Sequence, residues 1–486
     1  MIRRFVIALG FAAGSAAAGA QTPDSAARWV DSIFAPFTSG RSPGCAVGVT
    51  RDGALAFAKG YGLADLQHRA PIAPDTRFYI ASVSKQFTAM SVVLLAQDGR
   101  LSLDDSIRRW VPEVPSFGRP ITIRQLLHHT SGLRDYMTLL AVSGWPRDGE
   151  LTEKQFLDLV RRQKSLNFAP GDEFLYSNTG YALLSIVVKR ASGQSLRDFA
   201  AARIFKPLGM TQTEFRDDHT QAIPQRAIGY EMTETGAYQE IQPKVDVVGD
   251  AGVYSTVADL AKWDANFSDP IVGGPEGVAT MLEPGVLNNG QRVPYGLALT
   301  LGELRGMKTV AHSGSYGGYQ STVLRFPEVN IGVITLCNTS TASASLAEQV
   351  GSLMLGVVPR RATTTTVDVG PSMYVTGAPP ARVDTAAETR RRNDLLAQVA
   401  GSYYSDELDL PVSLVVRDGA LYLRRPKAPE IRFGAFAFDL FTSSDKMLLR
   451  LLRDEHGGIS GFTLTIGRVR DLQFARTEPG RGGHAP

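Results

Sequence analysis

The stretch Ser82-Val83-Ser84-Lys85 decides how this chain folds and acts, because it places a hydroxyl and an amine three residues apart. It opens an apolar run over residues 87–96 that is typical of a buried helix. Residues i and i+3 lie on one face of a helix, so the Ser82 hydroxyl and the Lys85 amine can touch. A serine hydroxyl becomes a useful nucleophile when a base lies against it. The stretch alone is weak evidence, since S-x-x-K also arises by chance in long chains.

Two later motifs strengthen this interpretation. The first is Tyr176-Ser177-Asn178 and the second is His312-Ser313-Gly314. In the order S-x-x-K, Y-x-N, H-x-G, the set resembles the serine β-lactamase and penicillin-binding-protein superfamily, and most closely its class C β-lactamase-like branch. That branch also contains DD-peptidases, D-aminopeptidases and esterases. The resemblance covers residues 26–355 and includes the flanking stretches at residues 78–85, 122–132 and 252–256.

The resemblance implies a role for each motif residue. Ser82 is expected to form an acyl-enzyme, and Lys85 to be its general base or to hold Tyr176 as a tyrosinate; the sequence leaves both open. Tyr176 is expected to pass a proton to or from the leaving group. Asn178 is expected to bond Lys85 or a substrate amide. The backbone N–H groups of Ser82 and Ser315 are the expected oxyanion hole.

His312 stands where typical β-lactamases have the lysine of a K-T-G motif. A neutral histidine anchors a carboxylate less strongly than a fixed ammonium does. This substitution favours an esterase or a DD-peptidase or D-aminopeptidase-like activity. A true class C-like β-lactamase and a non-catalytic penicillin-binding envelope protein remain the alternatives. Gly314 is expected to let substrate approach the strand edge closely, unless it serves only the turn geometry.

The N-terminus predicts export. Arg3 and Arg4 precede an apolar run over residues 5–18, and residues 18–20 fit an A-x-A cleavage site, so residues 1–20 read as a signal peptide. The run is shorter than the ~20 residues that span a bilayer. Its removal takes away two arginines and no acidic residue, which lowers the formal charge from +3 to +1. This small charge argues against nucleic acid or membrane as a partner. The resemblance implies a small molecule or peptide as the substrate. The predicted location is periplasmic or secreted.

The sequence offers no metal or cofactor motif. His128 and His129 are adjacent and would point about 100° apart on a helix, so they rarely share a metal. We interpret them as structural residues that shape the wall near the site. Cys45 and Cys337 lie in strand-like segments that look like neighbours in the family. Because cross-strand disulfide geometry is demanding, two buried thiols are the favoured prediction and a bridge is the alternative.

The hydrophobic pattern predicts an α+β fold. A helix is expected over residues 25–37, followed by strands over 45–50 and 54–61 that Arg51-Asp52-Gly53 joins as a hairpin. Three strand-like runs lie within residues 295–338. Strands at both ends with helices between them predict one antiparallel sheet packed on a helical insert. The resemblance implies the β-lactamase/transpeptidase-like sandwich, with the active site where sheet and insert meet.

The C-terminal region predicts a second, all-β domain. Leu414, Val416, Leu421 and Leu423 flank a turn at residues 417–419, and later apolar residues alternate with a period of two. This unit looks like the lipocalin-like domain often appended to β-lactamase-related proteins. The predicted organisation is a signal peptide (1–20), a hydrolase domain (21–357), a linker (358–391), an all-β domain (392–478) and a disordered tail (479–486).

Overall fold

The first part of the chain is built on a six-stranded antiparallel sheet. The computed structural model describes residues 23–146, 148–341, 343–356, 394–437 and 439–477. The predicted signal peptide, linker and tail lie outside these described residues. The sheet has the order β12-β13-β14-β15-β1-β2, so both ends of the first domain contribute to it, as predicted. Its strands are β1 (Cys45–Arg51), β2 (Ala54–Tyr61), β12 (Thr300–Leu304), β13 (Met307–Tyr316), β14 (Tyr319–Phe326) and β15 (Ile331–Cys337).

The predicted hairpin between β1 and β2 is confirmed. Asp52 and Gly53 both have positive φ, at 52° and 77°, which is the backbone of a tight hairpin turn. Residues 295–338 hold four sheet strands, however, and not the three that were predicted. The turn between β12 and β13 uses Arg305 and Gly306, whose φ angles are also positive. Arginine is an unusual residue for such a turn, which is why the sequence pattern did not separate these two strands.

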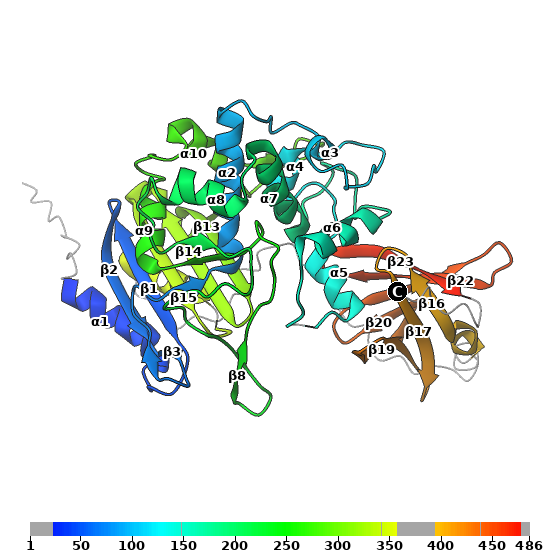
Figure 1. Cartoon of the computed structure of the whole chain (residues 1–486). Helices are drawn as coiled ribbons and strands as arrows, with labels where there is room; N and C mark the ends of the chain where they lie inside the picture. Colours follow the sequence, from blue (N-terminus) through cyan, green and yellow to red (C-terminus); the bar gives the residue numbers. More distant parts are fainter. Residues whose placement is uncertain (1–22, 147, 342, 357–393, 438, 478–486) are drawn as a thin grey trace, which may run out of the picture.

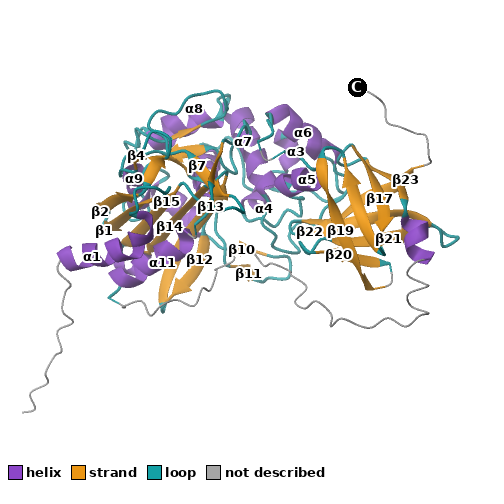
Figure 2. Ribbon diagram, turned by 90° about the horizontal axis from the view of Figure 1, so that it is seen from below, coloured by secondary structure: helices purple, strands orange, loops and turns teal. Residues whose placement is uncertain are grey.

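The two faces of the sheet belong to different cores, because side chains alternate along each strand. Cys45, Val47 and Val49 of β1 pack with α1 (Pro23–Phe34) and α11 (Ser343–Met354) on one face. Ala46, between them, joins the larger core on the other face, which includes α9 (Val257–Ala265). The sheet is therefore covered on both sides, and Figure 2 shows α1 and α11 together on one of them.

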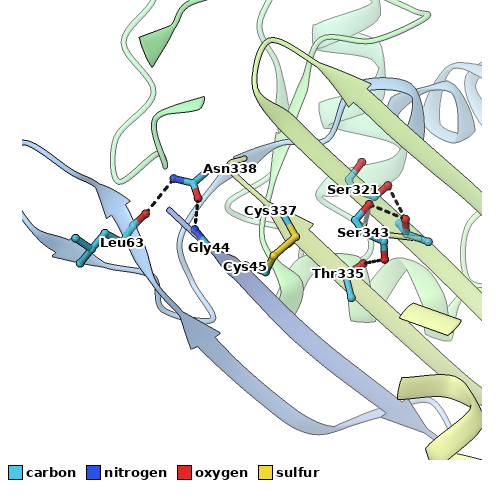
Figure 3. The surroundings of a disulfide bond; sticks show 9 residues. Gly44, Cys45, Leu63, Ser321, Thr335, Cys337, Asn338 and Ser343 are labelled. Atoms are coloured by element: carbon cyan, nitrogen blue, oxygen red, sulfur yellow. Dashed lines mark hydrogen bonds between the residues drawn. A yellow bond between two sulfur atoms is a disulfide. The ribbon is translucent and has the colours of Figure 1, made fainter. Parts of the chain in front are cut away.

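Cys45 and Cys337 form a disulfide, so the preference for two buried thiols was wrong (Figure 3). The register of β1 and β15 places the two cysteines directly opposite each other, with Cα atoms 4.0 Å apart. Opposed residues in an antiparallel pair point to the same face, so the two sulfur atoms meet. Beside them, Asn338 accepts a hydrogen bond from the Gly44 N–H at 2.8 Å and donates to the Leu63 carbonyl at 3.0 Å.

A helical insert lies between the sheet and the second domain in Figure 1. Its centre is α2, which is almost entirely buried and packs beside α7. The helices are α2 (Lys85–Gln97), α3 (Ile107–Trp110), α4 (Ile123–Leu127), α5 (Tyr136–Ser143), α6 (Glu153–Arg162), α7 (Asn178–Ser192), α8 (Leu196–Ala200), the π-helix η3 (Ala201–Phe205) and α10 (Gly274–Leu282). The 3-10 turns are η1 (Ala35–Phe37), η2 (Ala81–Ser84) and η4 (Pro327–Val329). Short strands complete the insert: β3 (Leu63–Asp65), β4 (Ala70–Pro71), β5 (Phe78–Tyr79), β6 (Glu214–Phe215), β7 (Gly229–Met232), β8 (Tyr238–Ile241), β9 (Val253–Ser255), β10 (Gly285–Val286) and β11 (Arg292–Val293).

The second domain is all-β, as the period of two predicted, and its eight antiparallel strands form a closed barrel. Its strands follow one another around the barrel, and the first pairs with the last to close it. They are β16 (Gly401–Ser405), β17 (Leu410–Arg417), β18 (Ala420–Arg425), β19 (Ala428–Ala437), β20 (Leu440–Ser443), β21 (Leu448–Arg453), β22 (Ile459–Ile466) and β23 (Val469–Thr477). Leucine and phenylalanine side chains such as Leu414, Leu423 and Phe462 fill the interior. Among the described helices, none has the length and apolar character needed to cross a membrane.

Candidate active site

Ser82 lies in the 3-10 turn η2, which runs directly into α2 at Lys85. In such a turn residues i and i+3 nearly eclipse, so Ser82 and Lys85 are brought together as predicted. The Ser82 side chain is half-buried and open to solvent on one side. Ala81, just before it, has a φ of 45°, a conformation that a residue with a Cβ adopts at a cost. Surrounding packing holds this strained turn, and strained backbone is common at functional sites.

Lys85 connects the predicted catalytic motifs. Its buried Nζ atom lies 3.0 Å from Ser82 Oγ and 2.9 Å from Asn178 Oδ1. A third contact, at 2.7 Å, is with the backbone carbonyl of Asp250. An ammonium has three protons and these three acceptors match them. A lysine that has lost one proton can accept the Ser82 proton with no change in geometry.

The strand β13 passes beside the nucleophile. A Cβ on Gly314 would lie 2.4 Å from the Ile80 carbonyl and 2.8 Å from the Ser82 nitrogen, so only glycine fits there. Tyr316 and Tyr319 close the β13–β14 hairpin, and Ser315 is the next position along. Because antiparallel pairs alternate, the Ser315 N–H points away from β14. This edge of β13 lies beyond the part that β12 covers. Gly314 brings this uncovered edge next to the Ser82 nitrogen, an arrangement that suits an oxyanion hole made of the Ser315 and Ser82 N–H groups.

Tyr176 lies over the lysine. Its ring centroid is 4.9 Å from Lys85 Nζ, and 94% of the residue is shielded from solvent. The His129 ring packs on it with centroids 4.1 Å apart. His129 Nδ1 also accepts the Ser177 N–H at 3.1 Å, which fixes the backbone next to Tyr176. The histidine pair was interpreted as shaping the wall near the site, and His129 occupies that position.

A chain of hydrogen bonds links His129 to His312 through Tyr295. His312 Nδ1 lies 2.7 Å from the Ser313 carbonyl, so this nitrogen carries the proton. His312 Nε2 then accepts from the Tyr295 hydroxyl at 3.0 Å. His129 Nε2, at 3.2 Å, donates to the same hydroxyl. Each ring therefore has a single tautomer, and both nitrogens of His312 are occupied inside the protein.

Both histidines are neutral at physiological pH. Burial, with a smaller contribution from the Lys85 charge, lowers the pKa of His312 to about 3. The same two causes hold the pKa of His129 well below its usual range. His312 was predicted to contact substrate. It is buried and its nitrogens are bonded, so the geometry suits it better to hold Tyr295 than to bind a carboxylate.

Two acidic residues that the sequence reading missed support the site. Asp135 caps α5 through the Thr138 N–H at 3.0 Å and accepts the first N–H of α7, that of Asn178, at 2.7 Å. Asp250 is buried, and burial raises the pKa of its carboxyl to about 6 despite the opposing Lys85 charge. Its Oδ2 accepts from Tyr136 at 3.1 Å. An aspartate just before a helical run was a recognisable cap signal for Asp135, whereas nothing in the sequence marked Asp250.

The barrel also contributes a residue that the sequence reading missed. Arg468 lies in the turn between β22 and β23, and its guanidinium is 4.5 Å from the centroid of the Tyr176 ring. One of its nitrogens is 3.8 Å from Asp135 Oδ2. No pattern in the sequence connects residue 468 with residue 176, because only the docking of the barrel brings them together.

An apolar pocket of about 270 Å³ opens at the end of β13. Ser315 and Tyr316 form one wall, and Met137, Leu140 and Trp145 from the region of α5 form another. Apart from this site, the described residues bring Glu150, His219 and Asp246 close enough to share an ion. His219 Nδ1 already lies 2.9 Å from Asp246 Oδ1, so this hydrogen bond accounts for the grouping.

Comparisons with known proteins place the first domain in a family. The family model described as Beta-lactamase matches residues 30–352. A D-aminopeptidase of Brucella anthropi is 25% identical over 90% of this chain and 96% of its own length. A D-aminopeptidase of Brucella ovis is 31% identical over 66% of this chain and 61% of its own length.

Solved structures share the whole architecture. The octameric penicillin-binding protein homologue from Pyrococcus abyssi is 25% identical, with a TM-score of 0.62. The match covers 93% of this chain and 99% of the Pyrococcus chain, so both domains of this chain lie within it.

Proposed function

Because this chain belongs to the β-lactamase family and is a serine hydrolase of that family, we propose that it cleaves amides, peptides or esters through an acyl-enzyme on Ser82. The observation that carries the proposal is the placement of Lys85 Nζ, 3.0 Å from Ser82 Oγ and buried. D-Amino-acid amides and peptides are the proposed substrate class, since the relatives reported above are D-aminopeptidases.

In the first step, Ser82 Oγ attacks the substrate carbonyl carbon. Lys85, in its neutral form, accepts the Ser82 proton along their hydrogen bond. The N–H groups of Ser82 and Ser315 stabilise the negative charge on the carbonyl oxygen. Tyr176 then passes a proton to the leaving amine or alcohol as the bond breaks. Asn178 and the Asp250 carbonyl keep Lys85 in place throughout.

In the second step, water attacks the ester formed on Ser82. The same groups act in reverse, so Lys85 and Tyr176 take the proton of the water and return one to Ser82. The chain from His129 through Tyr295 to His312 holds the ring of Tyr176 from behind. This makes His312 a positioning residue in the proposed mechanism.

The pocket beside Ser315 supports a proposal about the side chain of the substrate. Its walls are largely apolar, with Met137, Leu140, Trp145 and Ile241 among the lining residues. A side chain of the size of leucine or phenylalanine fits a volume of about 270 Å³. We therefore propose apolar D-amino acids next to the scissile bond.

The test compares the full chain with Ser82→Ala. D-Leu and L-Leu p-nitroanilides and p-nitrophenyl butyrate are the substrates, and intact mass is recorded after rapid acid quench. We expect turnover with a preference for the D form, a burst of p-nitrophenol, and an acyl adduct that is absent from Ser82→Ala. Equal turnover by the Ser82→Ala variant would refute the nucleophile. Penicillin G in the same assay tests β-lactam hydrolysis, for which neutral His312 offers little support.

We also propose that the chain is exported. The N-terminal residues carry the signal-peptide pattern, and a buried Cys45–Cys337 disulfide suits an oxidising compartment. Expression of the full sequence in a Gram-negative host, followed by osmotic shock, should release a protein shortened by about 20 residues. Recovery of the full-length chain in the cytoplasm would contradict export.

A further inference from the structure

The barrel presents one cation to the active site. The guanidinium of Arg468 lies against Tyr176, the same ring that faces Lys85. The Arg468 side chain is 38% exposed, so it is not sealed inside the protein. A guanidinium has five N–H donors in a planar fork that matches a carboxylate.

Hydrogen bonds from the hydrolase domain fix the backbone of this turn. Asn167 Nδ2 donates to the Arg468 carbonyl at 2.9 Å, and Asn167 Oδ1 accepts the Arg470 N–H at 2.8 Å. Arg134, which is buried, donates to the Arg470 carbonyl at 2.9 Å. Arg470 itself pairs with Glu173 through two bonds, at 3.1 and 3.0 Å. The fold therefore holds the backbone of Arg468 beside the site, and the guanidinium lies 4.5 Å from the centroid of the Tyr176 ring.

The neighbouring charges leave Arg468 able to bind an anion. Asp135, the acid nearest to it, is 3.8 Å away and already accepts the N–H groups of Asn178 and Thr138. Glu173 is paired with Arg470. The two histidines beside Tyr176 are neutral and cannot compete for an anion.

Typical β-lactamases have a lysine in the K-T-G motif that can anchor a carboxylate, and this chain has a histidine there. His312 occupies the position that a lysine holds in typical β-lactamases, and its nitrogens are bonded to Tyr295 and to the Ser313 carbonyl. Among the described residues around Tyr176, Arg468 is the cation that combines partial exposure with unused donors. A substrate carboxylate near Tyr176 would find its partner there.

We propose that Arg468 makes the active site selective for substrates that carry a carboxylate close to the scissile acyl group. The proposal rests on the proposed acyl-transfer function. It assigns the barrel a direct part in specificity, since the residue that reads the charge comes from the barrel and not from the hydrolase domain.

The experiment compares two esters that differ in one charge, p-nitrophenyl butyrate and mono-p-nitrophenyl glutarate. We expect Arg468→Ala to lower the ratio of kcat/KM for the glutarate over the butyrate by about ten- to hundred-fold. The loss should appear mainly in KM for the anionic ester, because a binding interaction is removed. Arg468→Lys should retain part of the preference, and 0.5 M salt should reduce it in the wild type.

Arg450→Ala is the matched control, because Arg450 is an exposed arginine on β21 of the same barrel. It should leave the ratio unchanged. If the wild type hydrolyses both esters and Arg468→Ala does not change their ratio, the inference about Arg468 is wrong while the proposed function stands.

A binding measurement separates the two proposals. Calorimetry with the Ser82→Ala variant gives the affinities for both esters without turnover. The same measurement on Ser82→Ala/Arg468→Ala gives the two affinities in the absence of the guanidinium. A preference for the glutarate that the second change removes supports Arg468 as the anion site, even if the wild type hydrolyses neither ester. Equal affinities in both chains overturn it.

Discussion

At the scale of single residues, Tyr295 shows how much of the site depends on one hydroxyl. This group accepts from His129 Nε2 and donates to His312 Nε2, and both rings are buried. Neither histidine has another partner for that nitrogen among the described residues. The sequence could not indicate Tyr295, because a tyrosine before a strand is far more often a core residue.

Tyr295→Phe should therefore weaken both stability and activity. It leaves two buried nitrogens without a partner, which costs about 1–3 kcal/mol of unfolding free energy. It also loosens the ring packed on Tyr176, so we expect kcat to fall about tenfold with little change in KM. Tyr403→Phe is the control, since Tyr403 is buried in the barrel and donates one bond, at 2.6 Å to the Val399 carbonyl. A normal kcat in Tyr295→Phe would show that the hydrogen bonds from His129 through Tyr295 to His312 do not position Tyr176.

Asp250 gives a pH-dependent prediction. Burial raises the pKa of its carboxyl from 3.8 to about 6. The folded chain thus binds this proton more tightly than the unfolded chain, and the stability that Asp250 contributes is lost as pH rises from about 4 to about 6. Asp250→Asn removes this titration and retains an acceptor for Tyr136. Between pH 4 and 7 the stability difference should shift in favour of the variant by about 2 kcal/mol.

Denaturant unfolding of both proteins at several pH values provides the measurement. The difference in unfolding free energy between the two proteins is the useful quantity. His312 contributes the same pH dependence to both proteins, with a sign opposite to that of Asp250, and it cancels in the difference. The pKa of His312 is lowered to about 3, so its contribution to stability is lost as pH falls below about 6. A difference that stays constant from pH 4 to 7 would mean that Asp250 does not titrate in this range.

At the scale of elements, the approach of β13 to η2 underlies the proposed oxyanion site. Gly314 permits it, since a Cβ there would meet the Ile80 carbonyl at 2.4 Å. Gly314→Ala should displace β13 from Ser82 and lower kcat/KM by about a hundredfold, the effect of losing one oxyanion donor. In Gly434→Ala the new Cβ has no neighbour within 4 Å, and this strand glycine is the control. Full activity in the Gly314→Ala variant would place the oxyanion hole elsewhere.

Elements were the level at which the sequence predicted most. Strand-like runs at both ends of the first domain predicted its sheet, and the period of two predicted that the second domain is all-β, because these patterns are local properties of the sequence. The three motifs supplied Ser82, Lys85 and Tyr176, which the structure brings together around one lysine. Predictions from the sequence failed for contacts that depend on strand register or on the docking of one domain on the other. The Cys45–Cys337 bridge needed the register of β1 against β15, and Arg468 needed the position of a separate domain.

At the scale of the whole molecule, the disulfide joins strands that are 292 residues apart in sequence. It closes a long loop in the unfolded chain, which is where most of its stabilisation arises. Replacing both cysteines by serine should lower the unfolding free energy by about 2–5 kcal/mol. Activity at 25 °C should persist, since the pair packs with α1 and α11 on the face away from Ser82. Alkylation of both thiols in unfolded, unreduced wild type would contradict the bridge.

The last prediction concerns a buried ion pair between the barrel and the hydrolase domain. Arg134 of the hydrolase domain and Glu407 of the barrel form an ion pair, with both side chains at most 2% exposed. Glu407→Gln leaves the Arg134 charge buried and unpaired, which costs about 3–5 kcal/mol. Asp406→Asn is the matched control, because Asp406 pairs with Lys164 at the surface, where such a change costs less than about 1 kcal/mol.

Glu407→Gln should therefore loosen the barrel before the sheet unfolds. Hydrogen exchange should rise in the β22–β23 turn, and the preference for mono-p-nitrophenyl glutarate should fall toward that of Arg468→Ala. Hydrolysis of the butyrate should change little, since Ser82, Lys85 and Tyr176 all belong to the hydrolase domain. If the activity of Glu407→Gln falls equally on both esters, the buried ion pair supports the hydrolase domain as a whole. The docking of the barrel would then not determine the preference between the esters.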